Sequence, residues 1–202
     1  MSKYKSEDLL NELIADVRRI KESATFFQNS DHTKMAYSPD KEKWSVVQVL
    51  EHLNAYNRHY LPMIEKELSV VTEANNSIFT PGYWGEKFTK MMKPNNVYQI
   101  KNKMKAMKAY TFTNNLNIQT VLKEFMAHQD HLLKLLELAK SRDLNNIRIP
   151  ITLTSMIKLK LGDMLRFLIA HEQRHMIQAR NTLKEMGVTT DRFPVILQVA
   201  HA

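Results

Sequence analysis

The last long stretch of regular sequence, residues 161–186, reads LGDMLRFLIAHEQRHMIQARNTLKEM. Its pattern predicts a helix over this whole range, and Gly187 follows as a helix-ending residue. His171 and His175 lie four residues apart, so they share one helix face and can both reach a single metal ion. A metal held for chemistry usually has three protein ligands and one open position. The pair alone therefore does not complete a site.

The same residues contain the pattern H-E-x-x-H, which is the short metalloprotease signature with the glutamate as general base. One form of that signature continues with a glycine and a further histidine, but Met176-Ile177-Gln178-Ala179-Arg180 follows here. The other form needs a glutamate on a following helix, and only Glu185 and a short tail remain. The sequence therefore disfavours a metalloprotease and indicates that a third ligand comes from upstream.

An earlier segment, residues 45–68, predicts another long helix with a candidate for this third ligand. Ser45 and Gln48 have the spacing of a capping box, which places the start of the helix. Two turns inside lies a stripe of residues at three- and four-residue steps: Val49, His52, Tyr56, His59 and Met63. By its position alone, His52 is either a hydrogen-bonded core histidine or a ligand. His59, further along the same stripe, competes with it for the role of third ligand.

Two blocks of the sequence resemble a known family. One runs from Trp44-Ser45 to His52-Leu53, and the other is His-Glu-x-Arg-His with a glutamine three residues on, here His171 to Gln178. Both are similar to blocks of the DinB/YfiT-like metal-binding four-helix bundles, which include hydrolases, bacillithiol S-transferases and thiol-dependent isomerases. The resemblance implies that His52, His171 and His175 are the three metal ligands. An imidazole set of this kind accepts zinc or nickel, and also iron or copper.

Four long helical patterns predict the fold. They cover about residues 6–29, 45–68, 117–140 and 161–186, and helices of this length in one small domain indicate an antiparallel bundle. We therefore expect an all-α, DinB/YfiT-like four-helix bundle that forms one domain over residues 1–202. Proline removes a backbone donor, so Pro62 is expected to kink or break the second helix.

The long connection of residues 72–116 is predicted to be largely irregular. It contains Pro81-Gly82-Tyr83-Trp84-Gly85, a turn whose two aromatic side chains either cover the mouth of the metal site or pack on the outside of the bundle. A short helix is expected over Glu86–Met92. Residues 96–113 are compatible with either helical or extended structure.

Two further histidines, His128 and His131, have a spacing that also permits metal binding. His128 falls on the apolar stripe of the third long helix. The repeated Glu-x-x-His pattern of di-iron bundles is missing, and Asp130 is an isolated carboxylate beside the two histidines. We therefore expect His128 to be a core residue or to lie behind the ligands, and His131 to be exposed.

The composition narrows the possible functions. The 202 residues carry a formal net charge of +8, but lysine and arginine are spread along all the predicted helices, and no nucleic-acid-binding motif accompanies the densest run, residues 101–108. No segment has the apolar length of a membrane span or the pattern of a signal peptide. We therefore expect a cytoplasmic protein without a nucleic-acid or membrane partner. The chain has no cysteine, so any thiol in its chemistry comes from a cosubstrate.

These observations predict a divalent-metal-dependent enzyme of the DinB-like type. It is expected to act on a small molecule through the three-histidine centre, either as a hydrolase or as a transferase of a low-molecular-weight thiol. Glu172, which follows a ligand, and Tyr56, one turn beyond His52, are the candidate catalytic residues. The alternative is a metal-binding or stress-response module without turnover, and a homodimer is the expected assembly.

Overall fold

The structure is a computed structural model that describes residues 3–70, 76–96, 99–100, 106–113, 115–152 and 154–197. Within these residues the chain forms six α-helices and one 3-10 helix. They are α1 (Ser6–Gln28), α2 (His32–Ala36), α3 (Val46–Val70), α4 (Tyr83–Met92), the 3-10 helix η1 (Lys108–Tyr110), α5 (Ile118–Ala139) and α6 (Leu161–Glu185). Two antiparallel strand pairs complete the described part: β1 (Tyr4–Lys5) with β2 (Ile78–Phe79), and β3 (Arg148–Ile151) with β4 (Thr154–Lys160).

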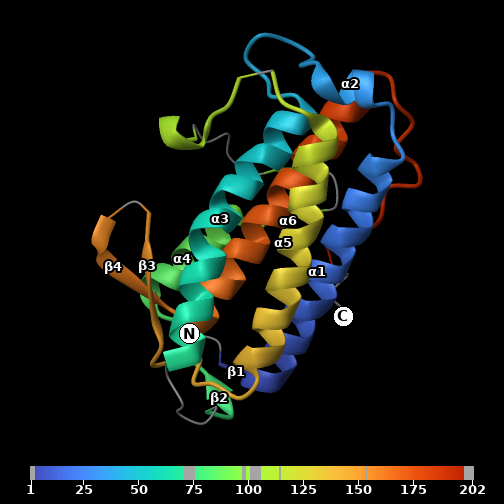
Figure 1. Cartoon of the computed structure of the whole chain (residues 1–202). Helices are drawn as coiled ribbons and strands as arrows, with labels where there is room; N and C mark the ends of the chain where they lie inside the picture. The colour runs from blue at the N-terminus through green and yellow to red at the C-terminus, as the bar shows by residue number, and fades with distance from the viewer. Residues whose placement is uncertain are drawn as a thin grey trace.

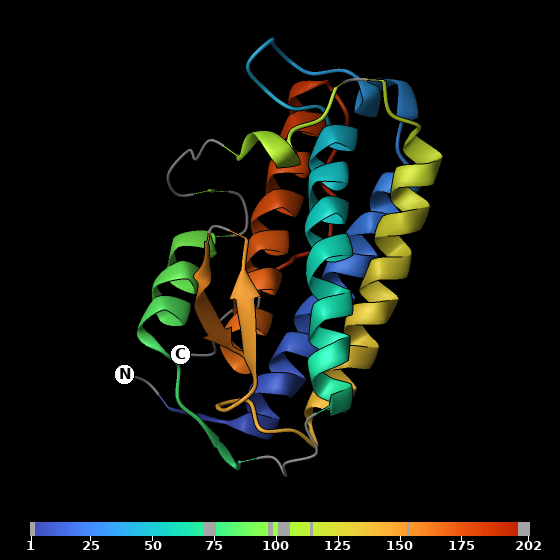
Figure 2. The same cartoon turned by 60° about the vertical axis from the view of Figure 1, so that its left-hand side comes forward.

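The four long helices α1, α3, α5 and α6 lie side by side as a bundle (Figure 1). Their limits lie within two residues of those predicted from the sequence, and the expectation of a mainly helical fold is confirmed. Helix α4 and the β3–β4 hairpin lie together against one side of this bundle (Figure 2). The two short sheets were not predicted, because their strands are brief and lie in segments without a clear period.

The direction of the helices differs from the wholly antiparallel order that the sequence predicted. Along the colour gradient of Figure 1, α1 and α6 run one way, and α3 and α5 run the other way. The neighbours α3 and α5 are therefore parallel, and their contacts advance together along both helices: Asn54 with Val121, Arg58 with Glu124, and Glu65 with His131. Parallel neighbours need a long crossover, and the connection between α3 and α5 provides it.

Polar side chains cap the starts of two of the long helices, and the first of these caps was predicted from the sequence. The backbone N–H of Ser45 donates to Gln48 Oε1 at 2.9 Å, and the backbone N–H of Gln48 donates to Ser45 Oγ at 3.3 Å, which is a capping box in front of α3. Asn117 Oδ1 accepts from the backbone N–H of Thr120 at 2.9 Å and caps α5. Helix α3 continues without interruption through Pro62, so the proline does not break it.

The core lies between the four long helices. Large apolar side chains from all of them are fully buried there: Phe27, Leu50, Phe125, Leu132 and Leu165. Each such side chain contributes about 1.5 to 3 kcal/mol through burial. The amide and carboxylate side chains of Asn54, Asn57, Gln129 and Glu172 are buried just as completely, with no exposed surface. Since a buried polar group is costly without a partner, their contacts matter for the site described below.

Helix α4 packs closely on the beginning of α6. The backbone N–H of Gly82 donates to Asp163 Oδ2 at 2.8 Å, and Arg166 Nη2 donates to Glu86 Oε2 at 2.9 Å. A Cβ atom at Gly85 would lie only 2.1 Å from Asp163 Cγ, so glycine is required for this approach. The predicted aromatic turn is therefore attached to the bundle, but Tyr83 and Trp84 form the first turn of α4, so the helix begins three residues before the predicted Glu86.

The connection between α3 and α5 is described only in part. Residues 71–75, 97–98, 101–105 and 114 lie outside the described residues, and so does most of the basic run at residues 101–108. Residues 96–113 were predicted to be either helical or extended. Where they are described, they form an isolated bridge between Asn96 and Gln99 and the short helix η1. Among the helices that the structure describes, none is long and apolar enough to cross a membrane.

Candidate metal centre

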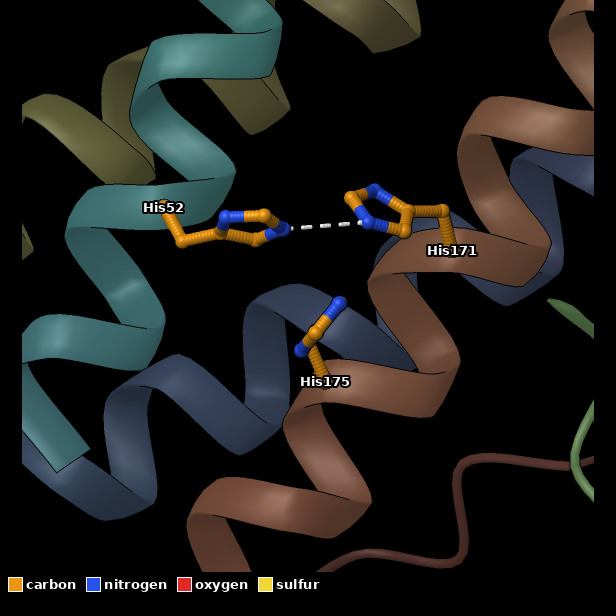
Figure 3. Close-up of side chains that lie close together, drawn as sticks. All are labelled: His52, His171 and His175. Atoms are coloured by element: carbon orange, nitrogen blue, oxygen red, sulfur yellow. Dashed lines mark hydrogen bonds between the residues drawn. The ribbon is translucent and has the colours of Figure 1, made fainter. Parts of the chain in front are cut away.

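Three histidines meet between α3 and α6. His52 comes from the second turn of α3, and His171 and His175 come from consecutive turns of α6 (Figure 3). One nitrogen of each ring lies within 4.8 Å of one nitrogen of each of the others. His52 Nε2 and His171 Nε2 lie 3.2 Å apart, within hydrogen-bond distance. The structure thus brings together the three residues that the sequence proposed as metal ligands.

Hydrogen bonds fix the orientation of two of the three rings. His52 Nδ1 donates to the backbone oxygen of Tyr110 at 2.8 Å, and His175 Nδ1 donates to Gln178 Oε1 at 2.8 Å. With Nδ1 protonated, the Nε2 lone pair of each ring is free to bind a metal ion, and such outer contacts are typical of metal-ligating histidines.

His171 is held in a different way. Its Nδ1 is buried and has no hydrogen-bond partner among the described residues. Instead its ring packs against Tyr56, with ring centroids 4.4 Å apart, and stacks with Phe167 at 6.0 Å and an interplanar angle of 10°. Aromatic packing rather than an acceptor therefore orients this ring.

Burial lowers the pKa of all three histidines. Desolvation is the first cause in each case, and at His171 and His175 the neighbouring imidazoles and Arg174 lower the pKa further. These rings are therefore neutral near pH 7, which is the state in which imidazole binds a metal. Three neutral nitrogen donors in mutual reach fit a divalent transition-metal ion or zinc.

Comparison with known proteins identifies the family. A family model described as the DinB superfamily matches residues 15–179, which is most of the chain and includes all three histidines. This chain belongs to the DinB superfamily. Neither the curated proteins nor the solved structures gave a match. The family predicted from the two sequence blocks is thereby confirmed.

In this DinB-superfamily protein, partly exposed aromatic side chains line the histidine cluster. Tyr56 lies beside His52, with ring centroids 5.0 Å apart, and beside His171. Burial raises the pKa of Tyr56 to about 12, so its hydroxyl is protonated at neutral pH. Trp44 lies on the other side, 5.0 Å from the ring of His52 and stacked at 6.3 Å with that of His175. The position proposed for Tyr56 is thus at the site.

Sequence reasoning missed two residues at the centre. Phe167 precedes His171 by four residues, so the helical period that paired the histidines could have found it. Tyr110 lies in the long connection and contributes a backbone oxygen, for which a sequence carries no signal.

Glu172, the other candidate catalytic residue, has its contacts in the bundle core rather than in the histidine cluster of this DinB-superfamily protein. Its Oε1 accepts from Asn57 Nδ2 at 2.8 Å and from Gln129 Nε2 at 3.1 Å. Its Oε2 is buried with no hydrogen-bond partner among the described residues. Burial raises the pKa of Glu172 to about 7, although the two amide hydrogen bonds act in the opposite direction.

The remaining candidate histidines lie outside the cluster. His59 is exposed, and its ring lies in a T-shaped arrangement with that of Tyr60, with ring centroids 4.9 Å apart. His128 Nδ1 donates to Asn54 Oδ1 at 3.2 Å, between α5 and α3, and its side chain is partly buried. His131 is partly exposed and pairs with a carboxylate of α3. Neither His59 nor His128 is therefore in a position to be the third ligand.

Proposed function

We propose that this protein is a divalent-metal-dependent enzyme that acts on a small molecule, either by hydrolysis or by transfer of a low-molecular-weight thiol. The observation that supports this most directly is the set of nitrogen atoms of His52, His171 and His175 within 4.8 Å of one another. Zinc and nickel are the first candidates for the metal, and iron and copper also suit three imidazoles.

The composition of the cluster favours a reactive centre over a closed structural one. Structural zinc sites usually have four protein ligands, whereas catalytic sites keep one position open. Among the described residues, the cluster contains three histidines and no cysteine, aspartate or glutamate. A divalent ion held by three neutral imidazoles keeps its full charge and lowers the pKa of a water or thiol that binds to it.

The residues around the cluster have separate tasks in this proposal. Tyr56 is protonated at neutral pH, so its hydroxyl serves as a hydrogen-bond donor to the substrate and not as a base. Tyr110 and Gln178 hold the rings of His52 and His175 through their Nδ1 atoms. Glu172 stabilises the position of α6 from the core side. Because the chain has no cysteine, a transferred thiol is a cosubstrate.

Metal content per chain tests the proposal. The protein is stripped with a chelator, reconstituted with zinc or nickel, and analysed for bound metal and affinity. We expect about one equivalent in the wild type and an affinity loss of more than about 100-fold in each of His52→Ala, His171→Ala and His175→Ala, since each removes a ligand. His59→Ala and His128→Ala are matched controls that remove a histidine outside the cluster and keep the metal.

The outcome separates the alternatives. A folded wild-type protein that takes up no metal would refute the proposal. A protein that binds one equivalent, but shows neither hydrolysis nor consumption of an added thiol across a panel of small electrophiles, would favour the non-catalytic module instead.

A further inference from the structure

Aromatic rings flank His171 in the histidine cluster. Tyr56 and Phe167 both contact its ring, and both are only partly buried. Tyr110 of η1 lies over Tyr56, with ring centroids 4.4 Å apart, and it is partly exposed as well. His52 and His171 are themselves only 2 % exposed, and these partly exposed aromatic rings lie beside them.

The aromatic surface continues away from the cluster along α4. Phe167 contacts Phe88 at 6.4 Å between ring centroids, and Phe88 stacks on Trp84 at 5.7 Å. Trp84 is 43 % exposed, so a row of rings leads from the protein surface to His171. We call Tyr56, Phe167, Phe88 and Trp84 the aromatic row. Helix α4, η1 and the hairpin lie on the same side of the bundle (Figure 2).

The docking of α4 on α6 holds three members of the aromatic row in place, Trp84 and Phe88 of α4 and Phe167 of α6. Asp163 accepts from the backbone of Gly82, Arg166 pairs with Glu86, and Gly85 permits an approach that any larger residue would prevent. Helix α4 turns Phe88 toward Phe167 of α6 as a result. A fixed arrangement of this kind suits recognition, because the rings need not be reordered when a ligand binds.

The surface of this row is mostly apolar. The polar atoms that its rings offer are the hydroxyl of Tyr56 and the indole nitrogen of Trp84, and Lys87 lies over the Trp84 ring at 5.1 Å rather than beside His171. Such a surface stabilises a flat apolar group by burial and by stacking.

We infer that the substrate carries an aryl or similarly flat apolar group, which lies against Tyr56 and Phe167 while its polar end reaches the histidine cluster. This inference rests on the proposed function, since it assumes a metal that the polar end binds. It adds the substrate class: an aromatic molecule, as opposed to a small wholly polar one.

Two metal-directed probes test this inference without knowledge of the substrate. Acetohydroxamate and benzohydroxamate have the same metal-binding group and differ in a methyl against a phenyl substituent. Their dissociation constants are measured by calorimetry on the zinc- or nickel-loaded protein. We expect benzohydroxamate to bind about tenfold more tightly, because its phenyl group is buried against the aromatic row.

Two substitutions test whether Phe167 causes the preference for benzohydroxamate over acetohydroxamate. Phe167→Leu retains an apolar side chain and is expected to reduce the tenfold preference to about twofold or less, with little change for acetohydroxamate. Phe193→Leu is the matched control, because Phe193 packs on Phe26 at 5.3 Å, away from the cluster, and it should keep the full preference.

Each result has a defined meaning. Equal affinities of the two probes for the wild-type protein, or an unchanged preference in a folded Phe167→Leu variant, would overturn the inference and leave the proposed metal centre intact. Absence of bound metal would instead overturn the proposed function itself. The wild-type comparison decides the matter even if Phe167→Leu does not fold.

Discussion

His171 and Glu172 are neighbours on α6, and both are almost fully buried, yet their surroundings are opposite. His171 meets two other imidazoles and partly exposed aromatic rings. Glu172 meets the amides of Asn57 and Gln129, which have no exposed surface. Adjacent faces of the same turn of α6 therefore have different roles: one face presents nitrogen donors, and the next holds α6 against α3 and α5.

Burial acts on the two side chains in opposite directions. It lowers the pKa of His171, which keeps the imidazole neutral and ready to bind a metal. It raises the pKa of Glu172 to about 7, so the carboxylate is charged above that pH at a cost to stability. Burial therefore provides a metal-binding nitrogen at His171 but lowers stability through the buried carboxylate of Glu172. The two amide hydrogen bonds partly offset this loss.

The largest expected effect is on stability. Glu172→Leu leaves Asn57 Nδ2 and Gln129 Nε2 buried without their present acceptor, so we expect the free energy of unfolding to fall by about 3 to 4 kcal/mol. Urea denaturation of the metal-free protein measures this. His171→Leu is the matched neighbour, and it should lower stability by only about 1 kcal/mol, because it loses the single hydrogen bond between its Nε2 and His52 Nε2. Equal losses of unfolding free energy in both variants would show that Glu172 is no more important for stability than His171.

A gain in stability is expected from Glu172→Gln. The oxygens Asn57 Oδ1 and Gln129 Oε1 are buried without a donor among the described residues, and a glutamine here removes the buried charge and offers one. At pH 8 we expect the metal-free variant to be about 1 to 2 kcal/mol more stable than the wild type. That is a rise of roughly 2 to 8 °C in melting temperature for a chain of this size. A lower melting temperature would show that the carboxylate itself is needed.

Much of this arrangement could be predicted from the sequence, because it depends on local spacing. The capping box at Ser45 placed the start of α3, and the four-residue spacing of His171 and His175 placed two donors on one face. The predicted antiparallel direction of α3 relative to α5 was wrong, because hydrophobic periodicity gives the length of a helix and not the path of a long crossover. The partners of Glu172 depend on that path, since Asn57 and Gln129 lie on those two helices.

A smaller effect, on metal affinity, is expected from Gln178, which orients one of the three clustered histidines. Gln178 Oε1 holds His175 through Nδ1, so Gln178→Leu should weaken zinc or nickel binding by about tenfold while one equivalent is still bound at saturation. Gln178→Glu restores an acceptor and should recover the affinity. An unchanged affinity in Gln178→Leu would indicate that packing against Trp44 alone orients this ring.

The smallest expected effect is on the pH dependence of stability. It comes from His128, which lies outside the histidine cluster and contacts Asn54. Desolvation lowers its pKa, and Arg58 and His131 lower it further, against the opposite influence of Glu124 and Glu51. The unfolded chain therefore binds a proton at higher pH than the folded one, so the contribution of His128 to stability is present above about pH 6.5 and is lost as the pH falls through its lowered value.

Unfolding free energies at pH 7.5 and pH 5 test this on metal-free protein. Wild type should lose more stability than His128→Gln over this range, by less than about 1 kcal/mol because the ring is only partly buried. The three clustered histidines titrate in both proteins, so their effect cancels in the comparison. An identical pH dependence would show that His128 is held by Asn54 alone and that its charge is tolerated. The metal centre would then be the part of the bundle where neutral imidazole matters.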